Sequence, residues 1–130
     1  MLLPDLLRAS ARKFPTKTAV SFPDGTRLSF GELDHHSDRV AARLASLGIG
    51  PKDRVGIISE NDAHALMCWW GIMKTGAESV DVPAQAGQAT IEGVVEEARP
   101  KALCVQGRLL GKLVSAGKPA VFPQHLVGAA

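Results

Sequence analysis

The sequence lacks several features that would assign a function at once. It has no tyrosine, and aromatic residues make up 5% of its 130 residues, which argues against a stacking platform for nucleic-acid bases. Lys and Arg total 15 against 13 for Asp and Glu, a near balance that gives no reason to expect nucleic acid or an anionic membrane as partner. No apolar run reaches the roughly 18 residues that a membrane span requires.

Cysteine is also scarce. Cys68 and Cys104 are too few and too far apart for a zinc cluster or a redox CxxC pair. Both lie in apolar runs, which predicts reduced thiols in the core of a cytosolic protein. At the N-terminus, Asp5 precedes the basic residues Arg8 and Arg12, the reverse of a signal peptide, so we expect a cytoplasmic location.

No phosphate-binding motif is present, neither G-x-x-x-x-G-K-[ST] nor G-x-G-x-x-G. The glycine-containing segment 48–53 is expected to follow a helix and open a strand, the reverse of a phosphate loop. We therefore expect its Lys52 and Asp53 to be turn and strand-entry residues. His35 and His36 are neighbours on an expected helix, with Asp34 and Asp38 nearby. Adjacent residues point about 100° apart, so we interpret them as a solvated helix face.

Two other groups invite a metal or phosphoacceptor role. Glu60 and Asp62 follow an expected buried strand, where open parallel sheets bind ligands, but Asn61 and Asp62 also suit the cap of the next helix. His64 lies four residues before Cys68 on that helix, and no further zinc ligand accompanies the pair. The site chemistry taken alone points to no reaction.

Hydrophobic periodicity and turn residues predict a regular order of elements. A Pro-Asp-Gly turn at 23–25 predicts a hairpin, and S-x-x-E at 29–32 is typical of a capping box. The apolar helix at 63–75 is expected to be buried, and Thr90 is expected to cap the helix after it. Helices are predicted over 3–14, 30–47, 63–75, 91–98 and 108–115, and strands over 18–22, 26–30, 54–59, 78–82, 101–105 and 119–122.

From residue 30 onward, helices and strands alternate. This order predicts an α/β fold: a mainly parallel, doubly wound sheet with helices on both faces and a leading β-hairpin. Residues 1–130 are expected to form a single domain, because this length accommodates one hydrophobic core.

Four segments together resemble the adenylate-forming (AMP-binding) family of acyl- and aryl-CoA synthetases and adenylation domains. Residues 28–33, L-S-F-G-E-L, are similar to the first core motif L-[ST]-Y-x-E-L, with Phe30 in place of Tyr. Residues 48–57 resemble G-[VI]-x-x-G-D-R-V-A-I, with Lys52 where the family usually has Gly. Residues 71–77 are similar to the second core motif G-x-[LM]-K-[AT]-G-A, although the proline expected two residues after Ala84 is absent. Residues 91–105 resemble the segment that follows.

The resemblance implies the amino-terminal subdomain of a much longer ligase. Such enzymes use ATP and Mg²⁺ to convert a carboxylic acid to an acyl-adenylate, then pass the acyl group to coenzyme A or a carrier protein. The family's phosphate loop, ribose-binding Asp and carboxyl-terminal lysine correspond to positions after residue 130. The resemblance therefore carries no catalytic, cofactor-binding or metal-binding residue to this chain, and we expect the chain alone to bind no cofactor and to be inactive. It implies structural roles for Ser29, Glu32, Leu33, Asp53, Lys74 and Gly76.

Two alternatives remain at this point. One is a stand-alone, non-catalytic module of the same family that binds another protein. The other is an unrelated flavodoxin-like regulator with Glu60 and Asp62 as its acidic pocket. For a fragment or a module, the missing half of the domain would leave apolar surface uncovered, so a homodimer is expected.

Overall fold

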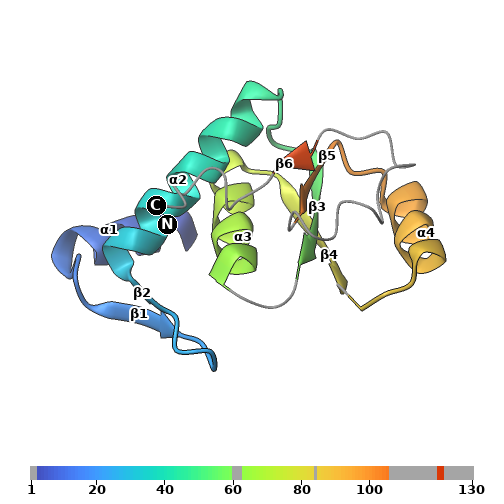
Figure 1. Cartoon of the computed structure of the whole chain (residues 1–130). Helices are drawn as coiled ribbons and strands as arrows, with labels where there is room; N and C mark the ends of the chain where they lie inside the picture. The colour runs from blue at the N-terminus through green and yellow to red at the C-terminus, as the bar shows by residue number, and fades with distance from the viewer. Residues whose placement is uncertain (1–2, 60–62, 84, 106–119, 122–130) are drawn as a thin grey trace.

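A parallel β-sheet with helices on both faces forms one part of the molecule, and a β-hairpin beside the first helix forms the other (Figure 1). The computed structural model describes residues 3–59, 63–83, 85–105 and 120–121. In chain order the elements are α1 (Leu3–Lys13), β1 (Thr18–Ser21), β2 (Arg27–Ser29), α2 (Phe30–Ser46), β3 (Arg54–Ser59), α3 (Ala63–Thr75), β4 (Glu78–Pro83), α4 (Gln88–Ala98), β5 (Ala102–Val105) and β6 (Ala120–Val121).

The sheet has the strand order β4-β3-β5-β6, and every neighbouring pair is parallel. The first two strands form a separate antiparallel hairpin. Both arrangements confirm the predicted fold class. Parallel neighbours require crossover connections, and α3 and α4 supply them between the strands they join.

Side chains alternate between the two faces of the sheet. Val55 and Ile57 of β3 pack with α2 and α3 in the larger core cluster. Ile58 of the same strand packs with Ile91 and Val95 of α4 in a smaller one. Because side chains alternate along a strand, one apolar run supplies both cores, and Figure 1 shows α3 and α4 on opposite sides of the sheet.

The closest helix contact lies between α2 and α3. Gly71 of α3 faces α2 where a Cβ atom would lie 2.6 Å from a side-chain carbon of Val40 and 3.1 Å from the Ser37 carbonyl oxygen. Both of these α2 residues are completely buried. Any side chain at position 71 would therefore push the two helices apart.

Several predicted elements needed correction. The structure places Gly87 at the N-cap of α4 and makes no side-chain cap there, so Thr90 lies inside the helix, contrary to the prediction. Phe30 already belongs to α2, which shortens the second hairpin strand. The apolar helix α3 is only partly enclosed, because Trp69 and Trp70 are half-buried. The predicted helix at 108–115 lies outside the described residues, whereas β6 confirms the last strand.

The first helix buries less than its apolar pattern indicated. Leu7 and Ala11 are buried, whereas Leu3, Leu6 and Phe14 remain exposed. The α1 helix contacts its neighbours along one narrow side, so most of its apolar residues lie outside the contact.

Candidate functional site

The first family-like segment forms a helix start. The Ser29 hydroxyl accepts a hydrogen bond from the Glu32 backbone N–H at 3.0 Å, and the Glu32 carboxylate accepts one from the Ser29 backbone N–H at 3.0 Å. The predicted capping box is thereby confirmed. The Ser29 backbone N–H is the main cause that lowers the pKa of Glu32. Leu33, the next residue of the motif, is buried in the larger core cluster.

The second segment forms a turn that enters β3. The Asp53 carboxylate accepts a hydrogen bond from the Gly50 backbone N–H at 2.8 Å and lies 3.7 Å from the Lys101 ammonium. That ammonium donates to the Gly48 carbonyl oxygen at 2.9 Å. The segment is therefore a turn and strand entry, as predicted, and Asp53 is held within the turn by the Gly50 backbone N–H.

Lys52 occupies an unusual backbone conformation within this turn. Its φ is 75°, in the left-handed region that favours glycine. This geometry gives a physical reason for glycine at the equivalent position in the family pattern. Gly76, at φ 82°, ends α3 in the same region, and a side chain there would also approach Pro51.

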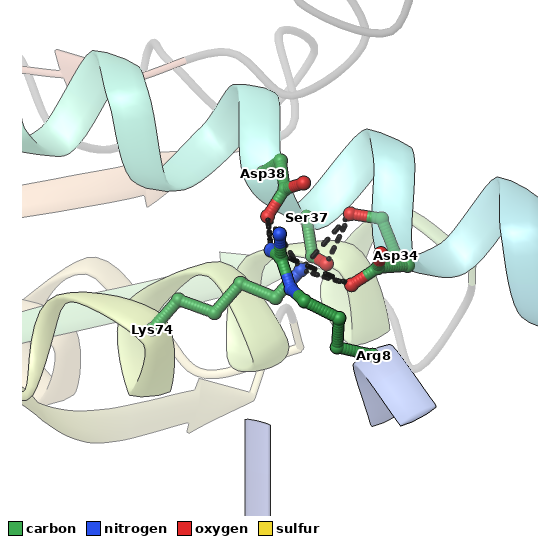
Figure 2. A network of polar contacts seen from close by, with 5 residues as sticks. All are labelled: Arg8, Asp34, Ser37, Asp38 and Lys74. Carbon is green, nitrogen blue, oxygen red and sulfur yellow. Dashed lines mark hydrogen bonds and ion pairs between the residues drawn. The ribbon is translucent and has the colours of Figure 1, made fainter. Parts of the chain in front are cut away.

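The third segment contains Lys74, the most deeply buried charged side chain in the described part of the chain. Lys74 lies in the last turn of α3, and its side chain is 7% exposed. Its ammonium donates to the Asp34 carboxylate at 2.7 Å, the Asp38 carboxylate at 2.8 Å and the Asp34 carbonyl oxygen at 2.9 Å. Figure 2 shows the lysine reaching across from α3 to the two aspartates on α2.

The network continues to the first helix. The Arg8 guanidinium of α1 donates to the same Asp38 carboxylate and lies 3.8 Å from Asp34 (Figure 2). The buried Ser37 hydroxyl donates to the Asp34 carbonyl oxygen at 3.0 Å. A cavity of about 530 Å³ opens beside this network, with Arg8, Asp38 and Lys74 in its wall.

This network can hold three helices together, and its positive and negative charges balance. Its two cations match its two carboxylates, and all three Lys74 hydrogen bonds go to acceptors on α2. Stabilising a triphosphate or a departing pyrophosphate needs cations and backbone donors aimed at the ligand. The Lys74 network is not arranged in this way, and among the described residues no group of three or more His, Cys, Asp or Glu could hold a metal ion.

Sequence reasoning missed this network. It placed Asp34 and Asp38 on a solvated helix face, whereas both contact Lys74. Two signals were present in the sequence: carboxylates spaced i and i+4 on one helix, and a lone lysine ending a nearly all-apolar helix. What the sequence did not show is that these two helices cross at that point.

The two adjacent histidines also differ. His35 is exposed as predicted, whereas His36 is half-buried, and its Nδ1 atom is shielded from water without a hydrogen-bond partner. Burial is the largest cause that lowers the pKa of His36, and the positive charge of His35 adds to it. The solvated-face interpretation is therefore wrong for His36.

The other predicted candidates that the structure describes do not assemble into a metal site. Cys68 and Cys104 are buried thiols that form no disulfide with each other, as predicted. His64 and Cys68 gain no further metal ligand within the described ranges. Glu60 and Asp62 lie outside the described residues.

Comparison with solved structures defines the class of fold. The chain matches the nonribosomal peptide synthetase FmoA3 with a TM-score of 0.90 and 27% identity, over 100% of this chain and 14% of that chain. It also matches the anthranilate CoA ligase AuaEII, in complex with anthranoyl-AMP, with a TM-score of 0.84 and 19% identity, over 98% of this chain and 27% of that chain. The fold is that of an adenylate-forming enzyme's N-terminal subdomain.

The sequence comparison identifies the family. The family described as "AMP-binding enzyme" matches residues 7–126, and the chain belongs to it. The chain is 30% identical over 107 residues to phosphinothricin tripeptide synthetase PhsC of Streptomyces viridochromogenes, which is 82% of this chain and 10% of that protein. It is also 30% identical over 107 residues to bacitracin synthase 1 of Bacillus licheniformis, covering 82% of this chain and 2% of that protein.

The chain thus spans a tenth or less of these curated relatives. Membership in this family excludes the alternative of an unrelated flavodoxin-like regulator. A solved form of FmoA3 holds AMPPNP, an ATP analogue, in agreement with ATP as the family's substrate. Within the described ranges, none of the helices combines the length and the apolar character needed to cross a bilayer.

Proposed function

We propose that this chain is the amino-terminal part of an ATP-dependent carboxylic acid ligase or adenylation domain. The complete enzyme would use ATP and Mg²⁺ to form an acyl-adenylate and transfer the acyl group to coenzyme A or a carrier protein. The observation that supports this most strongly is the family match over residues 7–126. Residues 1–130 would form one domain, a portion of the larger catalytic domain, in the cytoplasm.

The role of this part would be structural. Ser29 and Glu32 start α2, Leu33 fills the core, and Asp53 shapes the entry to β3. Lys74 fixes α3 to α2, and Gly76 allows the chain to leave α3 and enter β4. None of these six residues would touch the reacting atoms, and the principal partner would be the rest of the ligase. Neither nucleic acid nor a membrane span is part of this proposal.

The chain alone would be unable to adenylate an acid. The enclosed Lys74 ammonium donates to three acceptors on α2, so it is not available to a phosphate. ATP–pyrophosphate exchange with a panel of aliphatic, aryl and amino acids should remain at background for the 130-residue chain. Exchange above background with any acid would contradict this part of the proposal.

The mass of the native product tests the assignment to a longer enzyme. An antibody against residues 1–130 would be used on extracts of the source cell, with denaturing electrophoresis to measure mass. A product several times heavier than 13.7 kDa would support the proposal, and that product should catalyse pyrophosphate exchange. A product near 13.7 kDa would contradict it.

A stand-alone binding module of the same family is the second candidate. The exposed leucines of α1, Leu3 and Leu6, favour it, because apolar surface of this kind marks interaction sites. In this case the native product would be short and catalytically inactive. It would also co-purify in a fixed ratio with a partner protein, and loss of that partner on substitution of Leu6 would identify the surface.

A further inference from the structure

The α1 helix is attached to the rest of the molecule through little buried surface. Among its 11 residues, Leu7 and Ala11 are buried, whereas Leu3 and Leu6 are 52% and 49% exposed. A helix of this length is marginally stable in water by itself, so α1 depends on its contacts with α2, α3 and the hairpin to stay helical.

Two cavities border α1. One, of about 290 Å³, has Leu7 of α1 in its wall and lies between this helix, the hairpin, α2 and α3. The other, of about 530 Å³, has Pro4 and Arg8 in its wall, together with the end of α3. Atoms that line a cavity lack partners on one side and lose dispersion energy. The α1 helix is therefore packed less closely than α2 and α3, which meet at Gly71.

The ion pairs of α1 are arranged so that the helix can leave without stranding a charge. The Arg8 guanidinium is 43% exposed and donates to the Asp38 carboxylate (Figure 2). If Arg8 moved into water, Asp38 would keep its 2.8 Å hydrogen bond from the Lys74 ammonium. Asp34 would keep its 2.7 Å bond from the same ammonium. Breaking an ion pair is most costly when it leaves an uncompensated buried charge, and here it would not.

Two backbone hydrogen bonds fix the point where the movable part would end. The Gly31 N–H donates to the Pro15 carbonyl oxygen at 3.0 Å, and the Phe30 N–H donates to the Lys17 carbonyl oxygen at 2.9 Å. The first contact is close, because a Cβ atom at position 31 would lie 2.8 Å from the Pro15 oxygen. The chain that follows α1 is thus held to the first turn of α2, which places a hinge at Phe14 and Pro15.

We propose that α1 is a hinged cover, which opens as one unit while α2, α3 and the sheet stay folded. The ion pair of Arg8 with Asp38 is the latch that holds it closed. Opening uncovers the apolar side chains of α2 and α3 that line the cavity beside α1, among them Leu33, Leu66 and Trp70. The proposal concerns a motion within this chain and does not rest on the ligase assignment.

Amide hydrogen exchange of the 130-residue chain, measured for each residue by NMR, is the main test. The amides from Leu7 to Phe14 should share one level of protection, at least about tenfold below that of the α2 and α3 amides. The Phe30 and Gly31 amides lie beyond the hinge and should exchange as slowly as the rest of α2.

Three results of this experiment would overturn the proposal. Equal protection in α1 and α2 would mean that the two helices open only together. Protection that falls gradually from Phe14 toward Leu3 would mean that the chain end frays and that no hinge exists. Exchange of the α1 amides at the rate of an unfolded peptide would mean that the helix is not closed at all.

A substitution pair tests the latch. Arg8→Gln should speed exchange in α1 about two- to fivefold, because the pair it removes is partly exposed, and should leave α3 unchanged. Arg12→Gln is the matched control, since it removes the same charge from an exposed position of the same helix. Raising the salt concentration from about 0.05 M to about 0.5 M should speed α1 exchange in the control and much less in Arg8→Gln. Equal exchange rates in the two variants would contradict the latch.

Thiol labelling gives an independent measurement of opening. Ala11→Cys places a thiol on the buried side of α1, and Cys68 and Cys104, each 1% exposed, report on the core of the same molecule. The thiol at position 11 should react at least about tenfold faster than both native thiols, as measured by mass spectrometry of peptides. Reaction of all three thiols at one rate would show that α1 opens only when the whole chain unfolds, and would overturn the proposal.

Discussion

The helices on the two faces of the sheet pack differently. On one face, α2 and α3 pack tightly enough that Gly71 has no space for a methyl group, and they enclose the Lys74 ion pairs. On the other face, α4 packs through Ile91 and Val95, and a Cβ atom at Gly93 would meet nothing within 4 Å. Tolerance to a side chain at a helical glycine therefore depends on whether that position faces a neighbouring helix, as Gly71 does, or solvent, as Gly93 does.

The largest expected effect lies in the buried ion pairs. Lys74→Ala would remove the nearest cation from the enclosed Asp34 and leave Asp38 with Arg8 alone, and we expect a loss of about 3 kcal/mol in the free energy of unfolding. Urea denaturation would measure it. Lys101→Ala is the matched control, because that lysine is 50% exposed and 3.7 Å from Asp53, so its loss should stay below about 1 kcal/mol.

Lys74→Met separates charge from packing. It keeps the apolar stem of the side chain but removes the ammonium, so its destabilisation should approach that of Lys74→Ala if the ion pairs dominate. Equal and small losses for Lys74→Ala and Lys101→Ala would contradict the special role given to the enclosed lysine.

The next effect compares two helical glycines directly. Gly71→Ala should destabilise the chain by about 1–3 kcal/mol, because its methyl group would lie 2.6 Å from Val40. Gly93→Ala on α4 meets no neighbour and should stabilise by about 0.5–1 kcal/mol through helix propensity. Thermal unfolding followed by circular dichroism would measure both. If the unfolding temperature changed in the same direction in both variants, the predicted difference between Gly71 and Gly93 would be contradicted.

A smaller effect is expected at the start of α2. Ser29→Ala removes the capping hydroxyl and should cost about 1 kcal/mol, whereas Ser21→Ala on the exposed hairpin should change stability by less than about 0.5 kcal/mol. The lowered pKa of Glu32 adds a pH signature. The ionised Glu32 carboxylate stabilises the fold above its ordinary pKa of 4.5, and this stabilisation is lost as pH falls. The free energy of unfolding should therefore decrease less with acid in Glu32→Gln than in the unchanged chain.

The smallest effect concerns the half-buried histidine. The pKa of His36 is lowered by burial, so the unfolded chain binds a proton first as pH falls below the ordinary value of 6.5. Stability should therefore be full above pH 6.5 and decrease below it, because burial disfavours the charged imidazolium form of His36 in the folded chain. Denaturation at a series of pH values across this range would measure the effect. The free energy of unfolding should depend less on pH in His36→Gln than in the exposed control His35→Gln. Equal slopes would show that His36 carries no such penalty.

Much of the fold was predictable because its signals are local. The capping box of α2 depends on two residues three apart, and the strand at Arg54–Ser59 is recognisable from its β-branched, apolar run. The position of Thr90 was not predictable in this way, because a good capping residue lay inside a helix that begins at Gln88. There, α4 begins without a side-chain cap, and Ile91 and Val95 pack in the smaller core cluster, a tertiary contact that capping preference does not reveal.

Local order along the chain was therefore determined by the sequence itself: the alternation of helices and strands, the hairpin turn, the two buried thiols and the family-like motifs. Tertiary structure decided which charges meet. Lys74 finds Asp34 and Asp38 only because α2 and α3 cross at Gly71, and His36 loses its solvent by its place in the fold. The physical reason is distance: capping and periodicity act within a few residues, whereas the ion pairs join positions 36 and 40 residues apart.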